Sequence, residues 1–128
     1  MKTQITSGSR PISTFLSYSR EDTAKAEAVS QALKEKGLRV LLDSSHILFA
    51  EKWRARIDSL IESSDAFVFL ASPASSQSAE CQRELEYAAD LKKKIVPIAL
   101  QKPTGSWLPA AVRDLHLIEL SYPLKFGH

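Results

Sequence analysis

The stretch Ala66-Phe67-Val68-Phe69-Leu70-Ala71 is a run of six apolar residues, preceded by Asp65 and followed by Ser72-Pro73. An apolar run of this length without alternating polar residues is typical of a strand that is buried on both faces. Pro73 ends the run, because proline has no backbone N–H to continue a strand ladder. We therefore place residues 66–71 at the centre of a parallel sheet that is covered by helices on both faces.

Strand and helix patterns alternate on either side of this run. Strands are expected at residues 12–18, 38–42, 95–100 and 116–120, and loops at residues 43–52 and 101–109. Helices are expected after residue 19, around residues 53–64 and from about residues 75–78 onward, with at most a helical turn at residues 110–114. This alternation implies right-handed crossovers. The predicted fold is a flavodoxin-like α/β three-layer sandwich, whose five parallel strands have the order 2-1-3-4-5.

Single residues mark several element boundaries. Ser19 followed by Asp22 is a capping-box pattern that begins the first helix, and Gly37 is placed to end it. Pro97 favours a position near the sheet edge or at a bulge for its strand. The triplet at residues 92–94 is all lysine and is expected to be a solvated helix C-terminus.

The composition indicates a globular chain and excludes several function classes. The 128 residues are 44% hydrophobic and 25% charged, which suits one domain that needs no disulfide or metal. The four glycines are scattered, so no glycine-rich phosphate loop is present. The net charge is +2 with interspersed signs, which argues against a nucleic-acid partner. No apolar run is long enough to suggest a membrane partner.

The chain is expected to contain one domain with short extensions. Residues 1–10 are polar and predict a flexible arm without a signal peptide, and residues 11–122 form the domain. Residues 123–128 form a tail, which we expect to lead to a missing sensor domain. The single Cys81 favours a reducing, cytoplasmic location, and without a second cysteine or a nearby histidine it predicts no metal site.

In sheets of this kind ligands bind at the carboxyl ends of the strands. The candidate site is therefore formed by residues 18–22, 43–53 and 72–84 and by the loop after Leu100. A phosphoryl-accepting receiver is excluded, because no aspartate ends the strand at residues 66–71. A flavodoxin is disfavoured, because the loop after residue 17 contains no glycine to approach a phosphate.

Five segments in order resemble the TIR (Toll/interleukin-1 receptor) domains, and in particular bacterial ones of the NAD-hydrolase type. The first is Phe15-Leu16-Ser17-Tyr18-Ser19-Arg20-Glu21-Asp22. The others are Asp43 with Trp53, Ile57 and Ile61, then residues 63–73, then Ser78-Ala79-Glu80-Cys81-Gln82-Arg83-Glu84-Leu85, and finally residues 95–98. The resemblance covers about residues 12–120.

The resemblance implies two alternative functions. One is a NAD⁺ glycohydrolase that releases nicotinamide and ADP-ribose, or a cyclic ADP-ribose, after TIR self-association, and that serves bacterial antiviral defence. The other is a non-enzymatic scaffold that binds other TIR domains in signalling. NAD⁺ is a substrate in the first case, and no cofactor is expected in either.

Glu84 distinguishes the two alternatives. The resemblance to the pattern Ser-x-x-Cys-x-x-Glu-Leu implies that Glu84 is catalytic. From spacing alone it lies at the edge of the buried stripe formed by Cys81 and Leu85, and Glu80 lies one turn before it. The alternative is an ordinary solvated carboxylate that Arg83 balances.

The resemblance also implies a set of substrate-binding residues. Tyr18 either stacks on a ring of NAD⁺ or packs under a loop, and Arg20 either contacts the pyrophosphate or is solvated. Ser19 is either a substrate contact or only a helix N-cap, and Trp53 either lines the pocket or packs in the core. The full expected set is Ser17, Tyr18, Ser19, Arg20, Asp43, Trp53, Glu80 and Cys81.

A self-association loop is expected at Ile47, Leu48, Phe49 and Ala50. Its apolar tip suits docking against a second TIR domain. The family usually has glycine where this chain has Ala50, and alanine is costly in a left-handed conformation, so this loop is expected to follow a different path.

Overall fold

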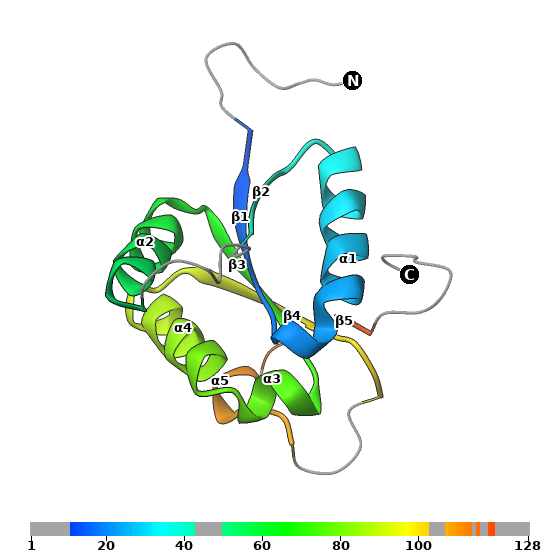
Figure 1. The fold of residues 1–128 in the computed structure, drawn as a ribbon. Helices are drawn as coiled ribbons and strands as arrows, with labels where there is room; N and C mark the ends of the chain where they lie inside the picture. The colour runs from blue at the N-terminus through cyan, green and yellow to red at the C-terminus, as the bar shows by residue number, and fades with distance from the viewer. Residues whose placement is uncertain (1–10, 43–49, 103–106, 114, 116–117, 120–128) are drawn as a thin grey trace.

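The computed structural model describes residues 11–42, 50–102, 107–113, 115 and 118–119. Strands and helices alternate along these residues (Figure 1). The elements are β1 (Ser13–Ser17), the 3₁₀ turn η1 (Arg20–Asp22), α1 (Thr23–Glu35), β2 (Arg39–Leu42), α2 (Ala50–Ser63), β3 (Ala66–Ala71), α3 (Pro73–Gln77), α4 (Ala79–Asp90), β4 (Lys94–Ala99), α5 (Ala110–Arg113) and β5 (Ile118–Glu119).

The sheet has five strands in the order β2-β1-β3-β4-β5, and every neighbouring pair is parallel. The predicted fold and strand order are therefore confirmed. In Figure 1, α1 covers one face of the sheet, and α2 and α4 cover the other. No helix within the described residues is long and apolar enough to cross a bilayer.

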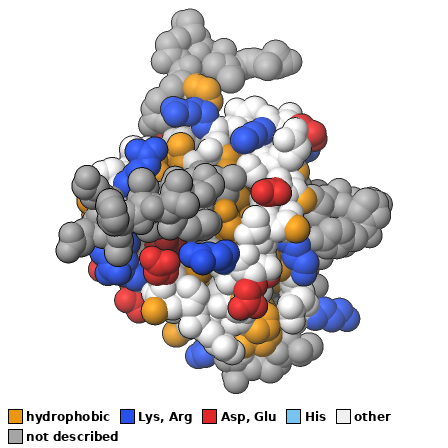
Figure 2. Space-filling view, in the orientation of Figure 1, with side chains coloured by type: hydrophobic (Ala, Val, Ile, Leu, Met, Phe, Trp, Pro, Cys, Tyr) orange, Lys and Arg blue, Asp and Glu red, His pale blue; other side chains and the backbone are white. Residues whose placement is uncertain are grey.

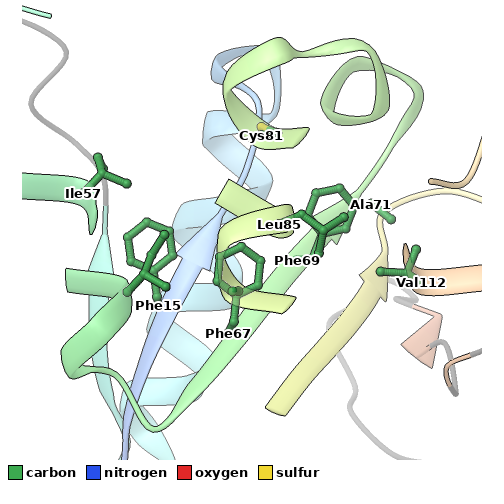
Figure 3. Packing of buried hydrophobic residues seen from close by; sticks show 10 residues of the cluster. Phe15, Ile57, Phe67, Phe69, Ala71, Cys81, Leu85 and Val112 are labelled. Atoms are coloured by element: carbon green, nitrogen blue, oxygen red, sulfur yellow. The ribbon is translucent and has the colours of Figure 1, made fainter. Parts of the chain in front are cut away.

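Strand β3 is buried on both faces, as its unbroken apolar run predicts. Phe67 and Phe69 point to the side of α2 and α4, whereas Val68 and Leu70 point to the side of α1. The rings of Phe15 and Phe67 stack with their centroids 5.5 Å apart (Figure 3). Two cores therefore fix β3 and β1 in place, and the strand ends that carry the site are fixed with them.

The first helix ends as its glycine predicts but begins later than expected. Gly37 has a φ of +89°, and Leu38 N–H donates to the Leu33 carbonyl at 3.2 Å, which forms a Schellman end. At the other end, Ser19 caps the 3₁₀ turn by accepting from Glu21 N–H at 3.3 Å. Helix α1 therefore starts at Thr23, because a separate 3₁₀ turn precedes it.

Two other boundaries correct the sequence interpretation. Residues 50–52, predicted as loop, already belong to α2. The single helix predicted from about residues 75–78 is two helices, α3 and α4. Ser72 forms a capping box with Ser75 and Pro73 opens α3, while Ser78 is extended and caps α4 by accepting from Cys81 N–H at 3.2 Å.

Pro97 lies beside the sheet edge and makes no bulge. The register between β3 and β4 is continuous from Ala66 opposite Lys94 to Ala71 opposite Ala99. On its other side, β4 pairs with the edge strand β5 only at Ile98 and Ala99 in the described residues. The sheet-edge interpretation is therefore correct, and the bulge interpretation is wrong.

The lysine triplet at residues 92–94 makes specific hydrogen bonds beyond those expected of a solvated helix end. Lys92 has a φ of 59°, and the N–H groups of Lys92 and Lys93 donate to Ala89 and Ala88 carbonyls, both at 3.0 Å, at the end of α4. Lys93 Nζ also donates to the carbonyls of Glu62 at 2.8 Å and Ser64 at 2.7 Å. Lys93 therefore ties the C-terminus of α2 to that of α4.

The surface charges are mixed in sign. Figure 2 shows acidic and basic side chains interspersed over one face, as the sequence predicts.

Replacing Lys92 with glycine should stabilise the protein. Lys92 adopts a left-handed conformation at the end of α4, where glycine has no Cβ penalty. We expect Lys92→Gly to raise the free energy of unfolding by about 1 kcal/mol, measured by urea denaturation.

Lys36→Gly is the matched control. Lys36 also follows a helix, but its φ is −87°, so glycine relieves no strain there and should give no gain. A Lys92→Gly protein that is no more stable than the parent would contradict the interpretation of this helix end.

Candidate active site

A cavity of about 330 Å³ opens where β1 ends and α4 begins. Two segments that are far apart in the sequence form its walls, one running from Tyr18 through η1 and the other being the first turns of α4. Both follow carboxyl ends of neighbouring parallel strands, which is where this fold class binds ligands. The lining residues are Tyr18, Ser19, Arg20, Glu21, Ser78, Glu80, Cys81 and Glu84.

Glu84 is the deepest charged group of the cavity. The residue is only 5% exposed, and one carboxylate oxygen accepts a hydrogen bond from Ser17 Oγ at 2.8 Å. Glu84 is buried on the same face of α4 as Cys81, Leu85 and Ala88, so the alternative of an ordinary solvated carboxylate is wrong. Arg83 does not balance it as a surface pair would, because Arg83 Nη1 donates to Asp58 Oδ1 on α2 at 3.0 Å.

The rim contains the other predicted residues that the structure brings together. Ser19 is half-buried and occupied as a cap, while Arg20 and Glu80 are exposed at the opening. Tyr18 lines the cavity and also packs against the core on the α1 side of the sheet, so stacking of its ring on a ligand stays a prediction. Together with the exposed Glu21, the described part of the rim thus combines one cation, two carboxylates and one aromatic side chain.

A buried polar network holds the η1 wall in place. Asp22 Oδ2 accepts from Ser72 Oγ at 2.6 Å, and Ser75 Oγ donates to the Leu70 carbonyl at 2.8 Å. The network joins the segment after β1 to the segment after β3. Sequence reasoning assigned Asp22 to a capping box, and nothing in local spacing indicates a bond across 50 positions.

Cys81 lines the cavity, as Glu84 does, and is 3% exposed. Figure 3 shows it on α4 in the apolar cluster. Burial is the largest cause that raises the pKa of its thiol, from an ordinary 9.0 to about 11, and the charges of Glu84 and Glu80 raise it further. Hydrogen bonds with Ser78 and Ser17 act in the opposite direction. The thiol is therefore neutral at ordinary pH and is a small buried group, as the sequence predicts.

Several predicted residues lie outside what the structure describes. Asp43, Ile47, Leu48 and Phe49 are outside the described residues, and Ala50 and Trp53 are described only as part of the α2 backbone. In contrast, two lining residues, Glu21 and Ser78, fall within the predicted site segments but were not in the expected substrate-binding set. Both stand beside expected residues in the quoted motifs, which was the available signal. No group of three or more potential metal ligands occurs among the described residues.

A family model described as "TIR domain" matches residues 14–126. The chain belongs to the TIR domain family. A plant protein from Brachypodium distachyon, named as a probable 2′ cyclic ADP-D-ribose synthase (BdTIR), is 32% identical over 103 residues. That match covers 78% of this chain but only 46% of the plant protein.

Solved TIR structures share the fold. A metazoan TIR-STING receptor from C. gigas, in complex with 2′,3′-cGAMP, matches with a TM-score of 0.69 and 26% identity, over 84% of this chain and 34% of that one. The TIR domain of the Toll-related receptor TRR-2 from Hydra magnipapillata matches with a TM-score of 0.66 and 21% identity, over 83% and 82% of the two chains. At 21% identity, the likeness to the Hydra magnipapillata domain shows a shared fold and nothing more.

The Cys81 thiol should react slowly with iodoacetamide in the folded protein. A pKa of about 11 instead of 9.0 lowers the thiolate fraction about 100-fold at pH 8, and burial limits access as well. We expect the rate of alkylation, followed by mass spectrometry, to rise as the pH approaches 11. The same chain in guanidinium chloride is the control and should react at the rate of an ordinary cysteine. Equal rates in both conditions would contradict the burial of this thiol.

Proposed function

We propose that this TIR domain cleaves the nicotinamide–ribose bond of NAD⁺, with Glu84 as the catalytic residue. The observation that carries the proposal is a buried carboxylate that lines a cavity at the carboxyl end of the sheet and is held there by a hydrogen bond from β1. A surface carboxylate of a scaffold needs neither the burial nor the buried partner, and burial of a charge is costly unless function or pairing offsets it.

The reaction requires little from the protein. The nicotinamide ring carries a positive charge, so the C1–N bond breaks with its electron pair returning to the ring nitrogen, and no general acid is needed. Positive charge develops at C1 and the ring oxygen of the ribose, and a nearby carboxylate stabilises it. Water then adds to C1 and loses a proton, which gives ADP-ribose. An internal nucleophile of the same molecule gives a cyclic ADP-ribose instead.

The geometry supports a role for Glu84 at this step. One carboxylate oxygen is occupied by Ser17, and the side chain still borders the cavity, so the group can face the ribose. Low exposure strengthens its interaction with developing charge, because little water screens it. Arg20 at the opening supplies a cation for the pyrophosphate, and Tyr18 supplies a ring face for a base.

The likeness to the plant relative supports the same reaction class. That relative is named as a probable 2′ cyclic ADP-D-ribose synthase, and cyclic ADP-ribose retains the atoms of NAD⁺ without nicotinamide. The matched region is about half of the relative's length, so hydrolysis or cyclisation by this chain remains part of our proposal.

We extend the proposal to activation by self-association, in the cytoplasm, as part of bacterial antiviral defence. The apolar sequence at Ile47, Leu48 and Phe49 supports docking of one TIR domain on another. The setting in defence is supported by the resemblance of the sequence motifs to bacterial TIR domains. These loop residues lie outside the described residues, so the support is from sequence.

Glu84→Gln should abolish nicotinamide release by the clustered protein. The substitution keeps the side-chain size and removes the charge, so we expect the rate to fall by about a hundredfold or more. The assay mixes the protein, concentrated or fused to a clustering domain, with NAD⁺ and follows nicotinamide and ADP-ribose by chromatography.

Glu86→Gln is the matched control for this experiment. Glu86 is on the same helix but is exposed and outside the cavity, so its activity should equal that of the parent. Equal release from Glu84→Gln would overturn the role of this residue. The absence of release from the clustered parent would overturn the enzyme proposal and leave the scaffold alternative.

A further inference from the structure

The Ser17 hydroxyl lies beneath the cavity and not on its wall. Ser17 is 1% exposed and is absent from the described residues that line the cavity, although the next four residues along the chain all line it. Its hydroxyl donates to Glu84 Oε1 at 2.8 Å. Ser17 was predicted to bind substrate, but the structure gives its hydroxyl to the carboxylate.

The strand geometry explains this placement. Side chains alternate between the faces of a strand, so Ser17 shares the face of Phe15, which packs on the α2 and α4 side. Tyr18 shares the other face with Leu16, on the α1 side. The pairing of Ser17 with Phe69 on β3 fixes the backbone below the hydroxyl, so the donor occupies a set position under α4.

We propose that Ser17 is the positioning residue of this site, which holds one oxygen of Glu84 so that the carboxylate keeps a single orientation toward the cavity. The inference rests on the proposed function of Glu84. A glutamate side chain has three rotatable bonds, and a donor anchored in the sheet removes that freedom before substrate binds. Such support of a functional group from outside the cavity is a general requirement of preorganised sites.

The hydrogen bond also favours the ionised carboxylate. Among the described residues, the other charged and titratable groups that line the cavity with Glu84 are Cys81 and Glu80 on its own helix, and Tyr18, Arg20 and Glu21 after β1. Two of these are carboxylates, which disfavour a third negative charge nearby. Donation from Ser17 acts against this repulsion without adding a charge, so it keeps Glu84 in the form that stabilises a cationic transition state.

The test compares Ser17→Ala with the parent in the clustered nicotinamide-release assay. We expect kcat to fall about ten- to a hundredfold, while KM changes by less than about threefold, because the hydroxyl contacts the catalytic group and not the substrate. Ser17→Thr, which restores the hydroxyl, should recover most of the lost kcat. A raised KM with unchanged kcat, or an Ala variant as active as the parent, would overturn the inference.

Ser30→Ala is the matched control. Ser30 is a buried serine on α1 whose hydroxyl has no hydrogen-bond partner among the described residues, so its loss should leave kcat and KM unchanged. Thermal melting of each variant verifies that the proteins compared are folded.

A second measurement is independent of activity and separates this inference from the proposed function. Carbon-13 NMR of the Glu84 carboxyl group follows its titration in the parent, Ser17→Ala and Ser30→Ala. We expect the Glu84 resonance to titrate at higher pH in Ser17→Ala only, because the ionised form loses its donor. An unchanged titration would overturn the inference even in an active enzyme. A shifted titration in a protein that releases no nicotinamide would support the contact while removing the enzyme proposal.

Discussion

The hydrogen bond from Ser17 to Glu84 is the contact on which the site depends, because a buried carboxylate needs a partner. Glu80 and Glu84 are one turn apart on α4, and such a like-charge pair opposes helix formation slightly. The structure offsets this in two places. Glu80 is in the first turn of α4, where the helix dipole favours negative charge, and Glu84 receives the hydroxyl of the sheet. The helix therefore presents two carboxylates to one cavity without an unpaired charge in the core.

The fold could be predicted because its decisive signals are local. The apolar run at β3 requires burial on both faces, Gly37 ends α1 at a positive φ, and Cys81, Leu85 and Ala88 mark the inner face of α4. Each signal depends on residues within a few positions of one another. Parallel pairing and strand order then follow from the alternation of strands and helices.

The features of the site that could not be predicted depend on contacts between segments far apart in the chain. The spacing of residues along the sequence does not show such contacts. The depth of Glu84 is set by how closely α4 packs on β1, and the start of α1 is delayed by a turn whose Asp22 binds Ser72. Spacing to Cys81 and Leu85 placed Glu84 at the edge of the buried stripe and left a solvated carboxylate open as the alternative, because positions along a helix do not show how deep a side chain lies. It also predicted a substrate contact for Ser17, since only the structure shows that Glu84, 67 positions away, lies within hydrogen-bond distance of its hydroxyl.

The charges around the cavity are consistent with cleavage of a cationic group. In the part of the chain that the structure describes, three carboxylates, Glu21, Glu80 and Glu84, line it with one guanidinium, that of Arg20. On the proposed function, this balance would favour the cationic nicotinamide end of NAD⁺ over the pyrophosphate, whose contacts would fall to the exposed Arg20 at the opening. The scattered glycines agree with this proposal, because a backbone nest for phosphate would not be needed if the fixed charges recognised the opposite end of the molecule. Binding and catalysis then use the same negative charge, which interacts more strongly as the ribose gains positive charge, and this difference between ground state and transition state is what accelerates a reaction.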